Sequence, residues 1–319
     1  MVSSHTKRSA AAYPKAEADR KGGAGTWPAG RDTPDEAAFK VQYACLGMTA
    51  AVVSRFRLLV YAFAAEQGRD LPWRRASDPW QVLVSEVMLQ QTQVDRVIPK
   101  YTALLERFPG PTALAAAPIP ELLEAWQGLG YNRRALNLQR AAQQVVTQWG
   151  GRLPDDPAQL QQLPGIGPYT AGAIAAFAFN RPTIFLETNI RAVLLHLFCG
   201  DRHGVKDKEL LVLAEQVLDH DRPRDWYNAL MDYGSDLKRR FPNPSRRSRH
   251  HSVQSRFEGS DRQVRGALLR LLLNTNGLTV GAIRQALATE PDRLQRILEG
   301  MVKEGFLQQR GGRYLIPPV

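Results

Sequence analysis

Apolar residues recur with a helical period over most of the chain, and proline and glycine interrupt that pattern at short intervals. The first helical pattern opens at Met48 and includes Val52, Phe56 and Leu59. Others follow at 79–91, 94–108, 119–128, 135–149, 158–163, 169–178, 189–198, 208–220 and 224–233. Strand-like alternation of apolar and polar residues is scarce among them. The pattern therefore predicts a helical, all-α domain over residues 48–237.

The segments on either side of this domain lack the helical period. Residues 1–47 are rich in alanine, glycine, proline, serine and charges of both signs, which predicts a disordered N-terminal extension. Residues 238–260 begin with KRRFPNPSRRSRHH, which contains prolines and many basic residues but no acid. This composition predicts a basic linker, either a solvated connector or an arm that contacts phosphates.

Residues 261–319 have a different pattern. Helical periods at 262–273, 279–287 and 291–304 precede FLQQRGGRYLI at 306–316, a short hairpin that turns at Gly311 and Gly312. Three helices followed by a two-stranded wing are typical of a winged helix, a fold that binds either DNA or another protein. We expect this C-terminal domain to add affinity for DNA and to take no part in the chemistry.

Charge and cysteine content narrow the function. Lys and Arg number 42 against 31 Asp and Glu, a net charge of +11, which favours a nucleic acid or an anionic membrane surface as partner. The two cysteines, Cys45 and Cys199, exclude a disulfide framework and any four-cysteine metal or iron–sulfur site. No stretch approaches the ~20 apolar residues of a membrane span. Because the first forty residues are polar and carry both charge signs, we expect no secretory signal. We expect a soluble intracellular protein, cytoplasmic and associated with the nucleoid, with no membrane partner.

The segment LPGIGPYTAGAIAAFAF at 163–179 joins two helical patterns through a tight turn. Gly165 and Gly167 let backbone amides approach a phosphate closely, and Pro168 takes the first position of the helix that follows. The positive end of that helix points to the same place. The turn is therefore expected to hold a DNA backbone regardless of sequence. On its own, an ordinary glycine-capped helix turn would have the same pattern.

Three further segments accompany this turn: LPWR at 71–74, SEVMLQQTQV at 85–94 and GLGYNRRA at 128–135. Together the four segments resemble the helix–hairpin–helix DNA glycosylase superfamily, most closely its adenine glycosylase (MutY-type) branch, from about Val53 to about Leu237. The resemblance implies two helical subdomains with a cleft into which a nucleotide is flipped. It also implies that the partner is double-stranded DNA with a mispaired or damaged base.

Hydrolysis of an N-glycosidic bond is served by two carboxyl groups, one that protonates the base and one that faces the cationic sugar. Glu86 lies in an apolar helical run, where a carboxyl group stays protonated and can act as the general acid. Glu187, in FLETNIRAV, stands where the family has an aspartate, and Asn189 matches the family's asparagine. The resemblance implies that Glu187 stabilises the transition state. The alternative is a glutamate that complements the dipole of the helix at Asn189.

The resemblance assigns roles to residues around this pair. Tyr169 stands where strand-cleaving members hold a lysine that forms a Schiff base. A tyrosine forms no imine, so base excision without strand cleavage is expected. Arg74 is similar to an arginine that the family places beside the catalytic pair.

Other residues are expected to touch DNA. Gln91 and Tyr131 resemble the residues that wedge into the stack vacated by the flipped nucleotide. A core aromatic beside a glycine-rich turn is the alternative for Tyr131. Leu89 and Thr92, on either side of Gln91, complete the set together with the two glycines of the turn.

These residues predict a monofunctional glycosylase of base excision repair, acting as a monomer on adenine mispaired with guanine or 8-oxoguanine. A thymine or uracil mismatch glycosylase is the first alternative, because Asn132 is closer to the motif of pyrimidine-processing relatives. In addition, a winged helix stands where adenine glycosylases carry a β-rich domain that reads 8-oxoguanine. A non-catalytic DNA-binding or regulatory protein is the second alternative, although it need not keep Glu86, Glu187, Arg74 and Tyr169 together.

The resemblance to the superfamily also bears on cofactors. Members of the superfamily commonly close the glycosylase domain with four cysteines that hold an iron–sulfur cluster. The equivalent stretch after Met231–Leu237 has none, and Lys238 lies near the place of the first cysteine. We therefore expect no iron–sulfur cluster and no other metal.

Overall fold

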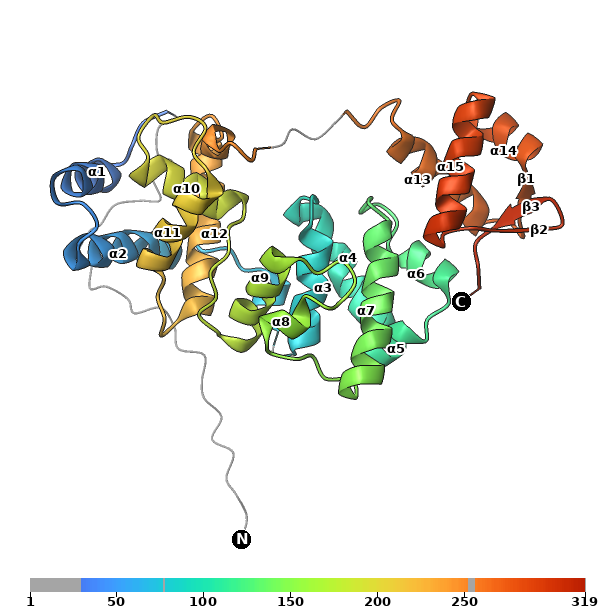
Figure 1. The fold of residues 1–319 in the computed structure, drawn as a ribbon, viewed down its shortest axis with the longest axis horizontal. Coiled ribbons are helices and arrows are strands. Elements are labelled where there is room, and N and C mark those ends of the chain that lie inside the picture. The colour runs from blue at the N-terminus through green and yellow to red at the C-terminus, as the bar shows by residue number, and fades with distance from the viewer. Residues whose placement is uncertain (1–29, 77, 252–255, 319) are drawn as a thin grey trace, which may run out of the picture. The chain divides into compact units, whose positions relative to one another are not determined.

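A computed structural model describes residues 30–76, 78–251 and 256–318. These residues form two compact units, each assembled from two separate stretches of chain. The first unit contains residues 30–70 and 180–251, and the second contains residues 71–179 and 256–318. Both are mainly helical, as predicted (Figure 1). In the part of the chain that is described, no helix has the length and apolar character needed to cross a membrane.

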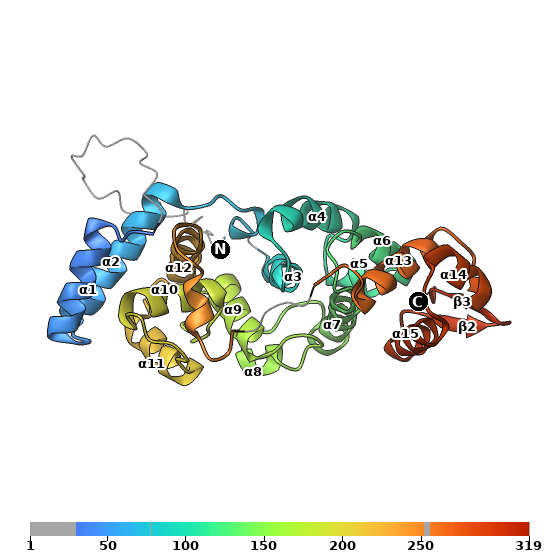
Figure 2. The same cartoon turned by 90° about the horizontal axis from the view of Figure 1, so that it is seen from above.

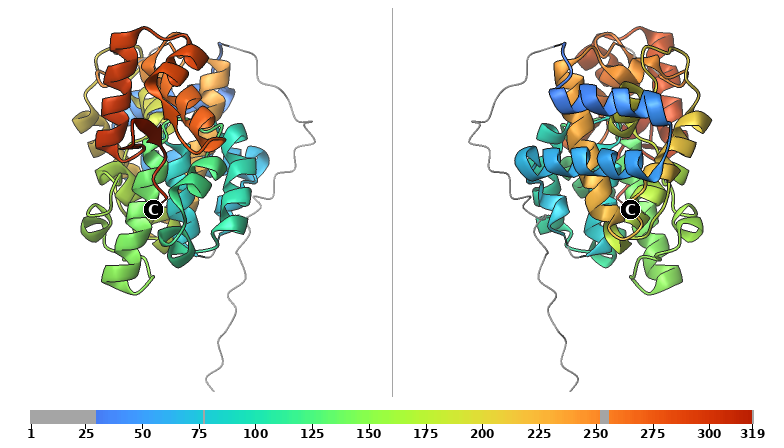
Figure 3. Two further views of the ribbon diagram at one scale, coloured as in Figure 1. Left: turned by 90° about the vertical axis from the view of Figure 1, so that its right-hand side faces the viewer. Right: turned by 90° about the vertical axis from the view of Figure 1, so that its left-hand side faces the viewer.

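The first unit is built around α12, which packs against α10 and α2. Its helical elements are α1 (Pro34–Leu46), α2 (Ala50–Gln67), α10 (Thr188–Phe198), α11 (Asp207–Val217), α12 (Pro223–Arg240) and the 3-10 helix η2 (Pro244–Arg247). Helices α1 and α2 lie side by side (Figure 3, right). Phe39 of α1 contacts Phe56 and Phe198, with ring centroids 5.6 and 5.3 Å apart. An aromatic cluster thus fixes α1 to the rest of the unit.

The prediction of a disordered extension is wrong for its last part, because Pro34–Leu46 forms α1. Thr33 and Glu36 form a reciprocal capping box at the start of the helix. The buried side chains of α1 are Glu36 and Phe39, and Tyr43 also packs against Phe198, so an acid and two aromatic residues hold a helix that has no continuous apolar stripe. This is why the pattern gave no helical signal. Residues 1–29 of the predicted extension lie outside the described residues.

Buried charges join α1 to α12. The guanidinium of Arg240 donates from Nη1 to Glu36 Oε2 at 3.1 Å and from Nε to Asp236 Oδ2 at 2.7 Å. The hydroxyl of Tyr233 donates to Glu36 Oε1 at 2.6 Å. Since Glu36 and Arg240 are almost inaccessible to solvent, the loss of either partner would leave an unpaired charge in the core.

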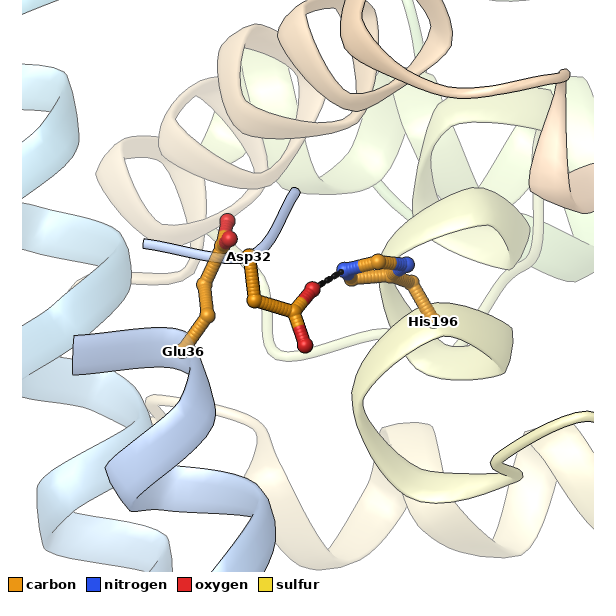
Figure 4. A group of neighbouring side chains, drawn as sticks. All are labelled: Asp32, Glu36 and His196. Atoms are coloured by element: carbon orange, nitrogen blue, oxygen red, sulfur yellow. Dashed lines mark hydrogen bonds and ion pairs between the residues drawn. The ribbon is translucent and has the colours of Figure 1, made fainter. Parts of the chain in front are cut away.

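Asp32 and His196 extend this network (Figure 4). Asp32 accepts from Lys40 Nζ at 2.7 Å and lies 2.9 Å from His196 Nε2. Burial, together with repulsion from Lys40, lowers the pKa of His196 to about 4, so the imidazole is neutral at physiological pH. Asp32, Glu36 and His196 offer the donor types of a metal site, but Lys40 and Arg240 already neutralise the two carboxylates. These internal ion pairs link the start of the described chain to α10 and α12.

The predicted basic linker, 238–260, is partly folded. Helix α12 continues to Arg240, and η2 packs against α10. The backbone of Val205 pairs with this segment through Arg247 and Arg249, at 3.2 and 2.9 Å. The prediction is wrong here because Arg240 is consumed by an internal ion-pair network instead of facing solvent. Residues 252–255 lie outside the described residues.

The second unit contains the remaining elements. Its first stretch holds the 3-10 helix η1 (Pro72–Arg74) and helices α3 (Pro79–Leu89), α4 (Val94–Arg107), α5 (Pro111–Ala115), α6 (Ile119–Ala125), α7 (Arg133–Trp149), α8 (Pro157–Leu160) and α9 (Pro168–Phe179). Its second stretch holds α13 (Asp261–Leu273), β1 (Leu278–Thr279), α14 (Val280–Leu287), α15 (Pro291–Glu304), β2 (Gln308–Arg310) and β3 (Arg313–Leu315). The strands form an antiparallel sheet of order β1-β3-β2, in which Tyr314 pairs with Leu278 and Gln309. This order of elements matches the expected winged helix, whose identification stays a prediction.

The C-terminal stretch packs onto the helices before it. One hydrophobic cluster runs from Leu83 of α3 to Leu268 of α13 and Ile297 of α15. Helix α13 contacts α6 (Figure 2), and Ile119 N donates to Pro318 O at 3.2 Å. The apolar faces of the C-terminal helices therefore share the core of the second unit, and the division into a 48–237 domain and a separate 261–319 domain stays a prediction.

Phe39→Ala should lower the free energy of unfolding by about 3–5 kcal/mol, because it empties a fully buried aromatic site. Val41 lies on the same helix and is 65% exposed, so Val41→Ala should change the free energy of unfolding by less than about 0.5 kcal/mol. Chemical denaturation of both variants measures the difference. Equal effects of the two substitutions would show that α1 does not pack through Phe39.

Candidate active site and DNA-binding loops

Glu86 is buried in the second unit. It lies near the C-terminal end of α3, is 8% exposed, and has the buried neighbours Ser85 and Val87. Helix α3 begins at an Asp78 cap and packs along α9 and α4, which places this acid within the core of the unit. Leu89 ends the helix and is half-buried. The side chain of Glu86 is thus largely shielded from solvent, and its role as general acid stays a prediction.

Two loops, which we call the wedge loops, follow α3 and precede α7; they comprise residues 90–92 and 128–131. Gln91 and Tyr131 at their tips adopt left-handed backbone conformations, with φ of 55° and 46°. Such values are unfavourable for residues other than glycine and persist only where the surroundings enforce them. Gln91 is exposed and Tyr131 is half-buried. Two predicted wedge residues therefore share an uncommon backbone geometry.

Arg134 enforces this geometry from the first turn of α7. Its side chain is buried and donates to Met88 O, Gln90 O and Gly130 O at 2.7, 2.5 and 3.0 Å. It also donates to the hydroxyl of Thr92 at 2.9 Å. Burial lowers the pKa of Arg134 to about 10, so the guanidinium remains charged at physiological pH. One cation therefore joins the end of α3 to both wedge loops.

The glycine turn before α9 is tied to the same region. Gln90 Nε2 donates to Thr170 Oγ1 at 3.3 Å and to Gly165 O at 3.5 Å. Gly165 has a φ of 81°, and a Cβ at this position would lie 3.0 Å from Asn137 Nδ2. Only glycine fits that turn. Gly165 and Gly167 are exposed at the N-terminal end of α9, where backbone amides are available to an anion.

Tyr169 and Arg74 also belong to the second unit. Tyr169 is the second residue of α9 and is half-buried. Arg74 is the last residue of η1 and is likewise half-buried. The second unit therefore contains every predicted site residue except Glu187 and Asn189.

Glu187 and Asn189 lie in the first unit, at the start of α10. Glu187 caps the helix, and its Oε1 accepts from the backbone amides of Asn189 and Ile190, the latter at 3.1 Å. Glu187 therefore caps α10 through Oε1, and its role in stabilising the transition state stays a prediction. Desolvation of the carboxyl group raises the pKa of Glu187, although Lys238 and the two amides oppose that shift. The side-chain oxygen of Asn189 is buried and makes no hydrogen bond to any described residue.

One face of α12 meets Glu187 and Asn189. Met231 Sδ lies 3.5 Å from Asn189 Nδ2, and a Cβ on Gly234 would come within 2.2 Å of Asn189 O, so this contact requires glycine. Lys238 is one turn beyond Gly234 on the same face. Its ammonium interacts electrostatically with Glu187, and burial, together with repulsion from Arg69, lowers the pKa of Lys238. A cation therefore opposes Glu187 where we predicted only the start of a linker.

Comparison with known proteins identifies the family. The sequence pattern described as HhH-GPD superfamily base excision DNA repair protein matches residues 84–216. Adenine DNA glycosylase of Mycolicibacterium smegmatis is 35% identical over 267 residues, which cover 78% of this chain and 91% of that protein. This chain belongs to the HhH-GPD superfamily, on its adenine DNA glycosylase branch. The resemblance inferred from the four motifs is thereby confirmed.

Two further relatives differ in how much they share with this chain. Human adenine DNA glycosylase is 39% identical over 199 residues, which cover 59% of this chain but 36% of the human protein. A solved structure titled as a thermostable thymine-DNA glycosylase superimposes with a TM-score of 0.52 at 26% identity, covering 57% of this chain and 86% of its own.

The iron–sulfur cluster common in the superfamily does not fit the residues of this chain. A cluster needs four thiolate ligands, and the sequence contains two cysteines. Cys45 lies on α1 and Cys199 follows α10, so neither is in the segment after α12. There, α12 and η2 are fixed by Arg240 and by backbone pairing with Val205. We derive no step of the reaction from a cluster.

Arg134→Met should lower the free energy of unfolding by about 3 kcal/mol or more, because several buried carbonyl groups lose their donor at once. Arg133→Met, one residue earlier and 64% exposed, should cost less than about 1 kcal/mol. Urea titration of the two variants measures the gap. Similar losses would show that Arg134 does not hold the wedge loops.

Proposed function

We propose that this chain hydrolyses the N-glycosidic bond of adenine mispaired with guanine or 8-oxoguanine and leaves the DNA strand intact. The observation that carries the proposal is its 35% identity to an adenine DNA glycosylase over 91% of that protein's length. The buried Glu86 and the desolvated Glu187 provide the two carboxyl groups that the reaction requires.

Chemistry begins after the adenine has been extruded from the duplex. Glu86 protonates the base while the bond to C1′ of the sugar breaks, and the base leaves neutral. The carboxylate of Glu187 faces the cationic sugar and stabilises it electrostatically. Water then adds to C1′, and its proton restores Glu86. Tyr169 offers no amine for a Schiff base, so the abasic strand is released uncut.

Two features of the second unit hold the DNA: the glycine turn before α9 and the wedge loops. Gln90 links them. The amides of Gly165, Gly167 and the first turn of α9 bind a phosphate. Gln91 and Tyr131 enter the duplex and fill the space vacated by the adenine. Thr92 acts indirectly, because its hydroxyl is bonded to Arg134 and to Leu129 O inside the protein.

A thymine or uracil mismatch glycosylase is the second candidate. It is favoured by the TM-score of 0.52 against the thymine-DNA glycosylase structure. It is also favoured by Asn132 in GLGYNRRA, the segment that contains the second wedge loop. Duplexes with one adenine opposite guanine, 8-oxoguanine, cytosine or thymine, and others with thymine or uracil opposite guanine, separate the two candidates. After incubation, alkali cuts abasic sites; cleavage before alkali would refute the monofunctional mechanism. Release of thymine or uracil alone would refute adenine excision.

Glu86→Gln should abolish base release while it leaves duplex affinity within a few-fold. The amide keeps the shape of the side chain but donates no acidic proton, and general acid catalysis contributes typically ~10²–10⁴-fold. Glu106→Gln, an exposed residue on α4, provides the control with the same change. Single-turnover rates at saturating protein measure the effect. More than about a tenth of the wild-type rate in Glu86→Gln would refute the assignment.

The pH dependence of excision should report Glu187. Glu187 must be ionised to stabilise the sugar, and burial raises its pKa, so the rate should fall with decreasing pH at values above the ordinary glutamate range. Glu187→Gln should lose most of the activity at every pH. An active Glu187→Gln variant would exclude the residue from the mechanism.

Lys238→Met should shift the fall of the excision rate at low pH, its acid limb, to higher pH. The reason is that removal of the opposing cation raises the pKa of Glu187 further. Lys238→Arg keeps the cation and should restore the wild-type limb. Single-turnover rates across a pH series, with melting temperatures measured in parallel, separate this effect from general destabilisation. An acid limb that stays in place in Lys238→Met would show that Lys238 does not act on Glu187.

A further inference from the structure

The C-terminal stretch reaches the second wedge loop through Arg262. Its guanidinium hydrogen-bonds the hydroxyl of Tyr131 and lies 5.2 Å from the centroid of the ring. The guanidinium of Arg134 lies 5.7 Å from the same centroid. Tyr131 therefore contacts two cations, one from α7 and one from α13, each at a distance typical of cation–π attraction.

Arg262 is held firmly enough to fix what it touches. It is the second residue of α13, whose N-terminus is capped by Ser260. The neighbouring Asp261 accepts from Arg293 at 2.8 Å and from Arg296 at 3.2 Å, both on α15. The start of α13 is thus tied to another helix of the C-terminal stretch.

The C-terminal stretch is in turn docked on α7. Glu304, at the end of α15, binds Arg265 of α13 at 2.5 Å and Arg133 of α7 at 2.7 Å. Arg140 of α7 donates to the backbone oxygen of Glu304 at 3.1 Å. Together with the shared hydrophobic cluster, these contacts fix the position of Arg262 relative to the wedge loops.

We propose that Arg262 is a positioning residue for Tyr131, so that the C-terminal stretch helps to open the duplex as well as to bind it. This inference rests on the wedge role given to Tyr131 under the proposed function. Arg262 keeps the ring of Tyr131 in the orientation set by the left-handed backbone, which lowers the cost of ordering the side chain when it enters the stack. This role differs from our expectation that the C-terminal stretch contributes to affinity for DNA alone.

The test compares Arg262→Ala with Arg270→Ala in the full chain. Arg270 is an exposed residue of the same helix, so its removal takes away the same charge without touching Tyr131. The probe is a duplex with adenine opposite guanine and a 2-aminopurine beside the adenine, whose fluorescence reports unstacking. Arg262→Ala should reduce both the fluorescence change at saturation and the single-turnover rate by roughly ten- to a hundredfold. Arg270→Ala should leave both near wild type.

Tyr131→Phe protects the test against simple undocking of the C-terminal stretch, because it removes the hydroxyl from the opposite side of the contact. The double variant should be no worse than Arg262→Ala. Equal behaviour of Arg262→Ala and Arg270→Ala, or losses that multiply in the double variant, would overturn the proposal. If the wild-type protein unstacks the duplex but releases no base, the proposed function fails while the fluorescence comparison still decides the role of Arg262.

Discussion

The second unit depends on a buried cation at the C-terminal end of a helix. The last carbonyl groups of α3 have no donors within the helix, and Arg134 supplies them from α7 while it also binds the carbonyl groups of Leu129 and Gly130. The positive charge complements the negative end of the helix dipole. Glu86 lies in the same last turn of α3 as Val87 and Met88, whose carbonyl groups Arg134 binds, so the contact that shapes the wedge loops also holds the helix that carries the proposed acid.

In the first unit, two departures from the family pattern meet at one place. Glu187 stands where the family has aspartate, and Lys238 lies near the position of the first cluster cysteine. Lys238 acts electrostatically on Glu187, and Gly234 allows α12 to pack closely against the backbone of Asn189 on α10. A buried carboxyl group tends to take up a proton, which would remove the charge needed beside a cationic sugar; the ammonium of Lys238 opposes that tendency. The lysine thus opposes, without cancelling, the effect of desolvation on the pKa of Glu187.

Much of this could be predicted from the sequence, and the failures have physical reasons. Helical periodicity located most of the helices between residues 48 and 237, although the short helices η1 and α5 were not predicted, and the motifs identified the family. Helix α1 was not predicted because Phe39 and the Glu36–Arg240 ion pair, rather than an apolar stripe, hold it in place. Arg134 received no role in the sequence analysis, yet it shares a helix face with Leu138, Ala141 and Val145 at spacings of four, seven and eleven. That spacing is the signal that would have found it.

Contacts between distant segments were beyond the reach of periodicity. No local pattern connects Lys238 with Glu187 or Arg262 with Tyr131, because each pair is brought together by packing of helices far apart in the chain. Basic residues in a strongly basic protein are ordinarily ascribed to solvent or DNA. In this chain, Arg134, Arg240 and Arg262 serve internal contacts first.

The most direct test of the account is a crystal structure of Glu86→Gln bound to a duplex with a single adenine opposite guanine. The account predicts that the adenine lies outside the stack against residue 86, that the carboxylate of Glu187 faces C1′ of its sugar, and that Gln91 and Tyr131 occupy the gap. Arg134 should keep its bonds to both wedge loops. An adenine that remains stacked while the wedge loops lie away from the duplex would contradict the account.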